Sequence, residues 1–173
     1  AFEMILTEEE EIAGLPESAL VQARASARAK GLEGWRFTLQ APSYQAFMQF
    51  AERRDLRQKL HEAFVNRANG GEHDNRPLIA RILELRREMA QLLGYRDFAD
   101  FRTEVNMAGS GGAAIEFERE LYDRTLPFYR EEMADLEAFA REELGVEGLE
   151  PWDEAFAAER LRKARFDLDS EEL

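Results

Sequence analysis

The stretch Asn75–Tyr95, NRPLIARILELRREMAQLLGY, decides the fold that we expect for this chain. Its large apolar residues recur at spacings of four, three, four and three, which is one stripe of an α-helix: Leu78, Ile82, Leu85, Met89 and Leu92. Three more apolar residues widen this stripe: Ile79, Leu83 and Leu93. Pro77 suits the first helical turn, and Gly94 suits a left-handed cap at the end. The pattern predicts a central buried helix at about 77–93, with the other helices packed around it.

The composition of the whole chain favours helices as well. Of 173 residues, 45% are apolar and 34% are charged, which is enough apolar material for one compact domain with its own core. Glu, Ala, Leu and Arg dominate, and β-branched residues are scarce, which favours helix over strand. The composition therefore predicts a mainly α-helical fold.

The charge and the missing cysteines exclude several classes of function. With 23 Lys and Arg against 36 Asp and Glu, the formal charge is −13, which repels phosphate backbones and anionic membranes. The absence of cysteine excludes disulfides and thiolate metal sites. No apolar run approaches the roughly 20 residues that span a bilayer, and no signal peptide is visible. We expect no nucleic-acid partner, no membrane partner and a cytoplasmic location.

One segment departs from the helical pattern. Residues 35–40, WRFTLQ, alternate large apolar and polar side chains after two glycines, which predicts a short β-strand. Residues 1–6 have the pattern of a helix end, so no second strand is expected. The partner of the predicted strand should then lie in missing sequence or in another copy of the chain. Its unpaired edges, with Trp35 and Phe37 partly uncovered, predict self-association from strand to strand.

The remaining apolar patterns predict further helices separated by glycine or proline turns. Their expected ranges are 16–30, 42–50, 55–64, 97–105 and 113–144, followed by a last helix that carries Phe156, Leu161 and Phe166. The two ends of the chain look cut. It starts without Met, and Asp169 with Glu172 has the spacing of a capping box with no helix after it. We expect residues 1–173 to be a single helical segment of a larger protein.

The histidines do not complete a metal site. His61-Glu62 resembles the start of His-Glu-x-x-His, but Val65 stands where the second histidine belongs. His73 lies alone in a glycine loop, and Gln58 and Gly70, three residues before the two histidines, exclude a di-iron Glu-x-x-His pattern. We therefore assign no catalytic, cofactor-binding or metal-binding residue to this chain.

The serines also have structural interpretations. Ser43, Ser110 and Ser170 stand where turns or helix caps favour serine, and no histidine is placed to activate them. A nucleophilic site is therefore not expected.

Several long stretches together resemble one family of peptidases. They are Gly14–Leu20 (GLPESAL), Ala29–Tyr44 (AKGLEGWRFTLQAPSY), Asp74–Tyr95, Pro151–Asp153 (PWD) and Glu159–Phe166 (ERLRKARF). In order and spacing, these stretches resemble the thimet oligopeptidase and oligopeptidase A family of zinc metallopeptidases. The resemblance covers nearly the whole chain.

The resemblance implies a soluble, mostly helical peptidase with a deep channel that admits short peptides. In that family, zinc is held by two histidines of His-Glu-x-x-His and a downstream glutamate, and the glutamate of the motif activates water. All of these residues would lie after Leu173, so none is carried onto this chain. We expect zinc and peptide substrates for the full-length parent, with this segment forming channel wall and scaffold and being inactive alone. The alternative is a free-standing acidic helical module that binds other proteins.

Overall fold

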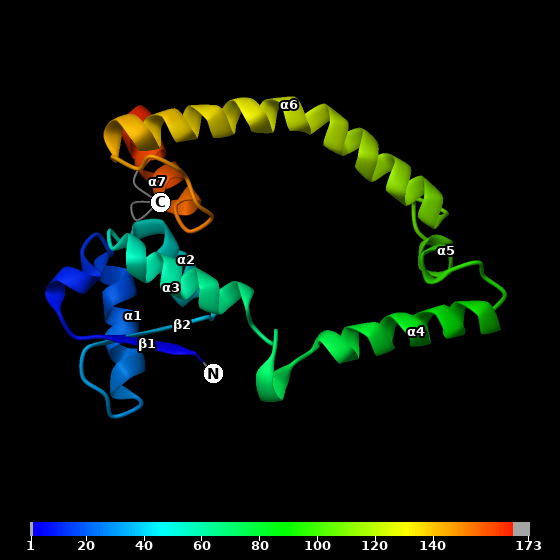
Figure 1. Cartoon of the computed structure of the whole chain (residues 1–173), viewed down its shortest axis with the longest axis horizontal. Coiled ribbons are helices and arrows are strands. Elements are labelled where there is room, and N and C mark those ends of the chain that lie inside the picture. The colour runs from blue at the N-terminus through cyan, green and yellow to red at the C-terminus, as the bar shows by residue number, and fades with distance from the viewer. Residues whose placement is uncertain (1, 168–173) are drawn as a thin grey trace. The chain divides into compact units, whose positions relative to one another are not determined.

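Two antiparallel strands and seven α-helices make up the part of the chain that the structure, a computed structural model, describes, which is residues 2–167 (Figure 1). The elements are β1 Glu3–Leu6, α1 Glu17–Arg28, β2 Trp35–Thr38, α2 Ala41–Phe50, α3 Arg54–Val65, α4 Arg76–Leu92, α5 Phe98–Thr103, α6 Gly111–Glu143 and α7 Glu154–Phe166. Short 3-10 helices occupy Glu9–Ile12 and Gly71–His73. The predicted mainly α-helical fold is confirmed. The capping box predicted at Asp169 and Glu172 lies outside the described residues.

The chain divides into two compact units, which we describe separately. Unit 1 comprises Ala1–Arg67 and Ala134–Leu173, and unit 2 comprises Ala68–Met133. Unit 1 contains the sheet, α1 to α3, α7 and the end of α6. Unit 2 contains α4, α5 and the beginning of α6.

The strand predicted at 35–40 is present, but the prediction about its partner was wrong. β2 pairs antiparallel with β1, in a register that sets Met4 opposite Phe37 and Leu6 opposite Trp35. Residues 1–6 were expected to end a helix. Glu3–Leu6 instead form β1, in which the buried Met4 and Leu6 alternate with exposed neighbours and pack in the cluster that includes Phe47 of α2. The partner of β2 is therefore supplied by the chain itself.

The basis of the predicted strand-to-strand association is wrong for the same reason. Trp35 is 7% exposed and Phe37 is 1% exposed, so neither forms an uncovered patch. α1 packs on β2. The buried residues of α1 have small side chains: Ala19, Ala23 and Ala27.

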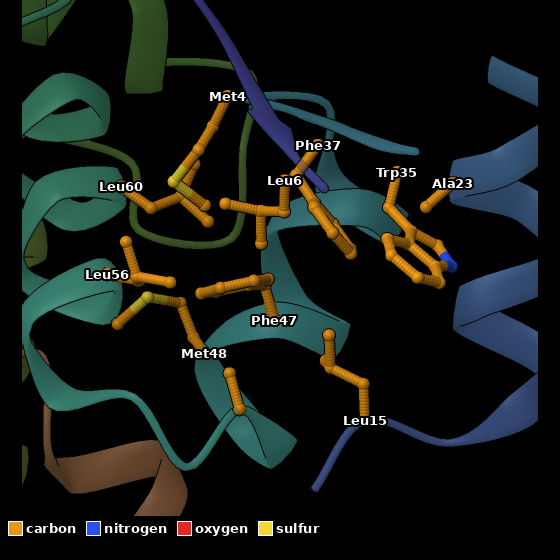
Figure 2. Packing of buried hydrophobic residues seen from close by; sticks show 11 residues of the cluster. Met4, Leu6, Leu15, Ala23, Trp35, Phe37, Phe47, Met48, Leu56 and Leu60 are labelled. Carbon is orange, nitrogen blue, oxygen red and sulfur yellow. The ribbon is translucent and has the colours of Figure 1, made fainter. Parts of the chain in front are cut away.

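The hydrophobic core lies in unit 1, between the sheet, α2 and α3. Figure 2 shows Met4, Leu6 and Phe37 from the strands meeting Phe47 and Met48 of α2, with side chains from α3 closing the cluster. The rings of Phe37 and Phe47 meet edge to face, with centroids 4.7 Å apart. This core holds the elements of unit 1 that position its polar clusters.

The prediction that residues 77–93 form a central buried helix was correct about the helix and wrong about its burial. α4 begins and ends almost where expected, but Ala90 is its only buried residue. Its partner within unit 2 is chiefly α5, which Asp97 caps by accepting a hydrogen bond of 2.9 Å from the backbone N–H of Asp100. The apolar stripe predicts that α4 has a face to bury, but it cannot specify which segment covers that face.

No helix within residues 2–167 is both long enough and apolar enough to cross a membrane.

Candidate functional site

The most deeply buried charges of unit 1 surround Asp153, in the turn that precedes α7. Asp153 is 1% exposed, and its carboxylate accepts hydrogen bonds from the guanidinium groups of Arg54 and Arg57. The Nη2 atoms of Arg54 and Arg57 lie 2.7 Å and 2.9 Å from its oxygens. The backbone N–H of Glu150 donates a further bond of 3.2 Å. The carboxylate thus links α3 to the Pro-Trp-Asp turn.

All three guanidinium nitrogens of Arg57 are engaged within the protein. Besides Asp153, Arg57 donates to the backbone carbonyls of Ala51, Glu52 and Trp152, at 2.6, 3.2 and 3.0 Å. The ring of Phe156 covers it, with the guanidinium carbon 4.1 Å from the ring centroid. Because its side chain is 1% exposed and each guanidinium nitrogen already donates within the protein, Arg57 is not accessible to a substrate.

The electrostatics of this cluster favour a permanent ion pair. Burial by itself raises the pKa of Asp153, but hydrogen bonds from Arg54 and Arg57 outweigh it and hold that pKa below its usual range. Burial lowers the pKa of Arg57, opposed by its hydrogen bond to Asp153, and a guanidinium stays protonated throughout the physiological range. A carboxylate whose pKa is lowered in this way and that accepts bonds from several donors is suited to be a structural anchor, and it is a poor general base.

A groove of about 430 Å³, lined by both polar and apolar residues, lies between α1, β2 and α2. Arg36 lines it, donating to Ser26 Oγ at 2.6 Å and to the Glu3 carboxylate at 2.9 Å. The Nε atom of Arg36 is buried without a hydrogen-bond partner among the described residues. The groove also contains hydroxyl and amide groups, from Ser18, Gln22, Thr38, Gln40 and Ser43. These groups can hydrogen-bond a ligand, but no histidine lines the groove to activate a hydroxyl.

His61 is half-buried on α3. Its Nδ1 lies 3.1 Å from Tyr44 Oη, and its ring meets the edge of the Trp152 ring at 6.1 Å. Val65, one turn further on, is 56% exposed and offers no ligand. His61 is part of an aromatic contact between α2, α3 and the turn before α7.

His73 belongs to unit 2, where it ends the 3-10 helix Gly71–His73 with its side chain exposed. Across residues 2–167, His, Asp and Glu side chains nowhere gather in threes or more in a way that could hold a metal ion. The donor set of a zinc peptidase, two imidazoles and a carboxylate, is therefore not assembled in this part of the chain.

Two of the three serines considered as nucleophiles, Ser43 and Ser110, have the structural roles that their positions predicted. Ser43 Oγ accepts the backbone N–H of Thr38 at 3.0 Å, and Ser110 Oγ accepts that of Ala113 at 3.1 Å at the start of α6. Ser170 lies outside the described residues.

Reasoning from the sequence missed the anchor formed by Arg57 and Asp153. Arg57 is buried beside Leu56 and Leu60 on the apolar face of α3, so an arginine in an apolar stripe was the available signal. A buried guanidinium needs a buried acid, and the acid stood in the Pro-Trp-Asp turn. Almost a hundred residues separate the two, so the sequence alone could not pair them.

The sequence is similar to known peptidases over nearly its whole length. The model of peptidase family M3 matches residues 47–173. Oligopeptidase A of Salmonella typhimurium is 39% identical over 98% of this chain and 26% of its own length. The organellar oligopeptidase A of Arabidopsis thaliana is 38% identical over 99% of this chain and 23% of its own length.

A dipeptidyl carboxypeptidase of Escherichia coli is 31% identical over 98% of this chain and 25% of its own length. The chain thus spans about a quarter of the length of the curated relatives that it matches. Since the family model matches most of the chain and the relatives match it almost from end to end, the chain belongs to peptidase family M3.

Proposed function

We propose that this chain is a segment of a zinc-dependent oligopeptidase that hydrolyses short peptides. The observation that supports this most strongly is the match with oligopeptidase A, which runs through 98% of the chain without being limited to one motif. Within the parent, the segment acts as helical scaffold and channel wall. Zinc and peptide substrates belong to the parent, and the cytoplasmic location expected from the sequence stays a prediction.

The arrangement of unit 1 supports a scaffold role. The buried guanidinium of Arg57 and the carboxylate of Asp153 are held by hydrogen bonds within the protein, and Tyr44 and Trp152 contact His61. In a zinc peptidase the metal polarises the attacking water and the scissile carbonyl. The residues described here do not fit that donor set, so we propose that residues elsewhere in the parent hold the metal.

A peptidase assay tests the proposal. The 173-residue chain and the parent, each supplied with zinc, are given a fluorogenic oligopeptide. We expect chelator-sensitive hydrolysis by the parent alone. Turnover by the isolated chain at a rate near that of the parent would place the catalytic site within these residues and refute the scaffold role.

The sequence of the gene downstream of Leu173 separates this proposal from its alternative. A His-Glu-x-x-His motif within about a hundred codons supports the peptidase, because the motif supplies two of the three zinc ligands and the general base. A stop codon directly after Leu173 supports a free-standing module that binds other proteins.

A further inference from the structure

The helices of unit 2 leave a large apolar surface exposed within that unit. The principal stripe of α4 is 44% to 88% exposed: Leu78, Ile82, Leu85, Met89 and Leu92. Ile79 and Leu83, exposed by 55% and 60%, form a second row on the same helix. At 100° per residue, the two rows lie about 120° apart around the axis. α4 therefore has apolar surface on two of its sides.

The part of α6 that belongs to unit 2 has the same character. Ile115, Tyr122 and Tyr129 recur every seven residues along one side. A second row is about 120° away around the helix axis: Phe117, Leu121 and Phe128. All six side chains are between 49% and 66% exposed. A helix that is apolar on two sides is typical of the interior of a helical protein, where it has neighbours on both sides.

The area of this surface is large enough for a stable interface. A half-exposed side chain of this size presents on the order of 100 Å². The thirteen side chains of these four rows therefore present on the order of 1,000 Å², compared with about 800 Å² per partner in a standard interface.

We infer that the apolar rows of α4 and α6 are the surface on which helices from the rest of the parent polypeptide pack. This inference rests on the proposed function, because the chain spans about a quarter of its relatives' length, which leaves about three quarters of the parent to supply those helices. A tethered segment has an effective concentration in the millimolar range. A tethered helix of the parent therefore outcompetes a second copy of the chain. Two copies would also repel each other, because each has a formal charge of −13.

The charge of α4 specifies the partner further. α4 carries four arginines and two glutamates, an excess of two positive charges in a strongly acidic chain: Arg76, Arg81, Arg86, Arg87, Glu84 and Glu88. The helices that cover α4 should therefore have an apolar stripe with acidic residues on its flanks.

Thiol labelling tests this interface, because the chain has no cysteine of its own. Ile82→Cys and Phe117→Cys place a thiol in an apolar row of α4 and α6. Gln91→Cys and Asp123→Cys are the matched controls, on exposed polar sides of the same helices. Each variant is made in the 173-residue chain and in the parent, and the labelling rate of this segment is followed by mass spectrometry.

We expect thiols at Ile82 and Phe117 to be labelled at least tenfold more slowly in the parent than in the 173-residue chain, with both controls unchanged. Equal rates in the two proteins would overturn the inference. Slow labelling that becomes fast when the parent is diluted would also overturn it, because a second copy would then be the partner.

Two further measurements make the outcome decisive. Hydrogen exchange of the unsubstituted proteins compares α4 and α6 without any change of sequence, and equal exchange in the chain and the parent would overturn the inference. Peptidase activity of the parent is recorded separately. An inactive parent with protected thiols refutes the proposed function and supports the interface, whereas an active parent with reactive thiols refutes the interface alone.

Discussion

At the scale of single residues, Asp153 is the side chain whose loss should destabilise unit 1 most clearly. Asp153→Ala leaves the buried guanidinium of Arg57 without its counter-charge. Removing one partner of a buried ion pair costs about 3–5 kcal/mol. We expect the free energy of unfolding, measured with urea, to fall by that amount.

The matched control is the exposed pair of Arg165 with Asp135, in which both side chains are nearly half exposed. Asp135→Ala should cost about 0–1 kcal/mol, as surface pairs generally do. If Asp153→Ala were no more destabilising than Asp135→Ala, the anchoring role of Asp153 would be wrong. The double variant Arg57→Met with Asp153→Ala should lose less stability than the sum of the single changes.

The ion pair between Glu3 and Arg36 predicts a dependence of stability on pH. The hydrogen bond from Arg36 lowers the pKa of Glu3 from 4.5 to about 2. The unfolded chain therefore takes up a proton at this carboxylate before the folded chain does. The contribution of the pair is complete above pH 4.5 and is lost as the pH falls towards 2.

Urea midpoints between pH 6 and pH 2.5 check this expectation in the wild type and in Glu3→Gln. The difference between the two proteins should shrink as the pH falls through this window. A difference that stays constant down to pH 2.5 would show that the carboxylate does not interact with Arg36 as described.

At the scale of elements, the turn before β2 depends on Gly34. Its φ of +83° is in the left-handed region, and a Cβ there would lie 2.1 Å from the carbonyl oxygen of Leu6 at the end of β1. Gly31, with a φ of +69°, has the same type of backbone without the crowding, because a Cβ added there would meet no atom within 4 Å.

Alanine at these two glycines should therefore have different effects. Gly31→Ala should cost about 1–2 kcal/mol from the left-handed backbone alone. Gly34→Ala should cost more, since β1 and β2 must also separate, and urea unfolding measures both. Equal losses would mean that the close approach of Gly34 to β1 does not contribute to stability.

At the scale of the whole molecule, the two units should differ in stability when the 173-residue chain is studied alone. Unit 1 contains the buried apolar cluster, whereas α4 has one buried residue. Most of the stability of a helix in a protein comes from packing of its apolar face, and little of α4 is packed. Amide exchange should therefore be slow in β2, α2 and α3 and fast in α4.

Hydrogen exchange with peptide-level mass spectrometry measures this difference. The same experiment on the parent connects it to the proposed interface, because α4 should become protected there. Exchange in α4 of the isolated chain as slow as in α3 would show that α4 is already covered.

The elements could be predicted from the sequence to different degrees. The start of α5 after Asp97 is signalled by a capping side chain, and the strand at 35–40 by alternating apolar and polar residues. Both signals are local in sequence, so both elements were recognised. β1 was missed because four residues, EMIL, are too few to show a period, and their strand conformation depends on pairing with residues 29 to 35 positions away. The anchor at Asp153 was missed for the same reason of distance along the chain.

The sequence by itself determined that this chain is mainly helical, where most of its helices run and which family it belongs to. These properties follow from the spacing and order of residues, and no tertiary contact is needed to recognise them. Only the tertiary structure decided that the core lies under the small sheet of unit 1 and that the other elements of unit 2 leave most of α4 exposed. An apolar stripe indicates that a helix has a face to bury, but the segment that covers it is selected by contacts distant in sequence. For α4 and α6, we propose that those contacts are made by the rest of the parent peptidase.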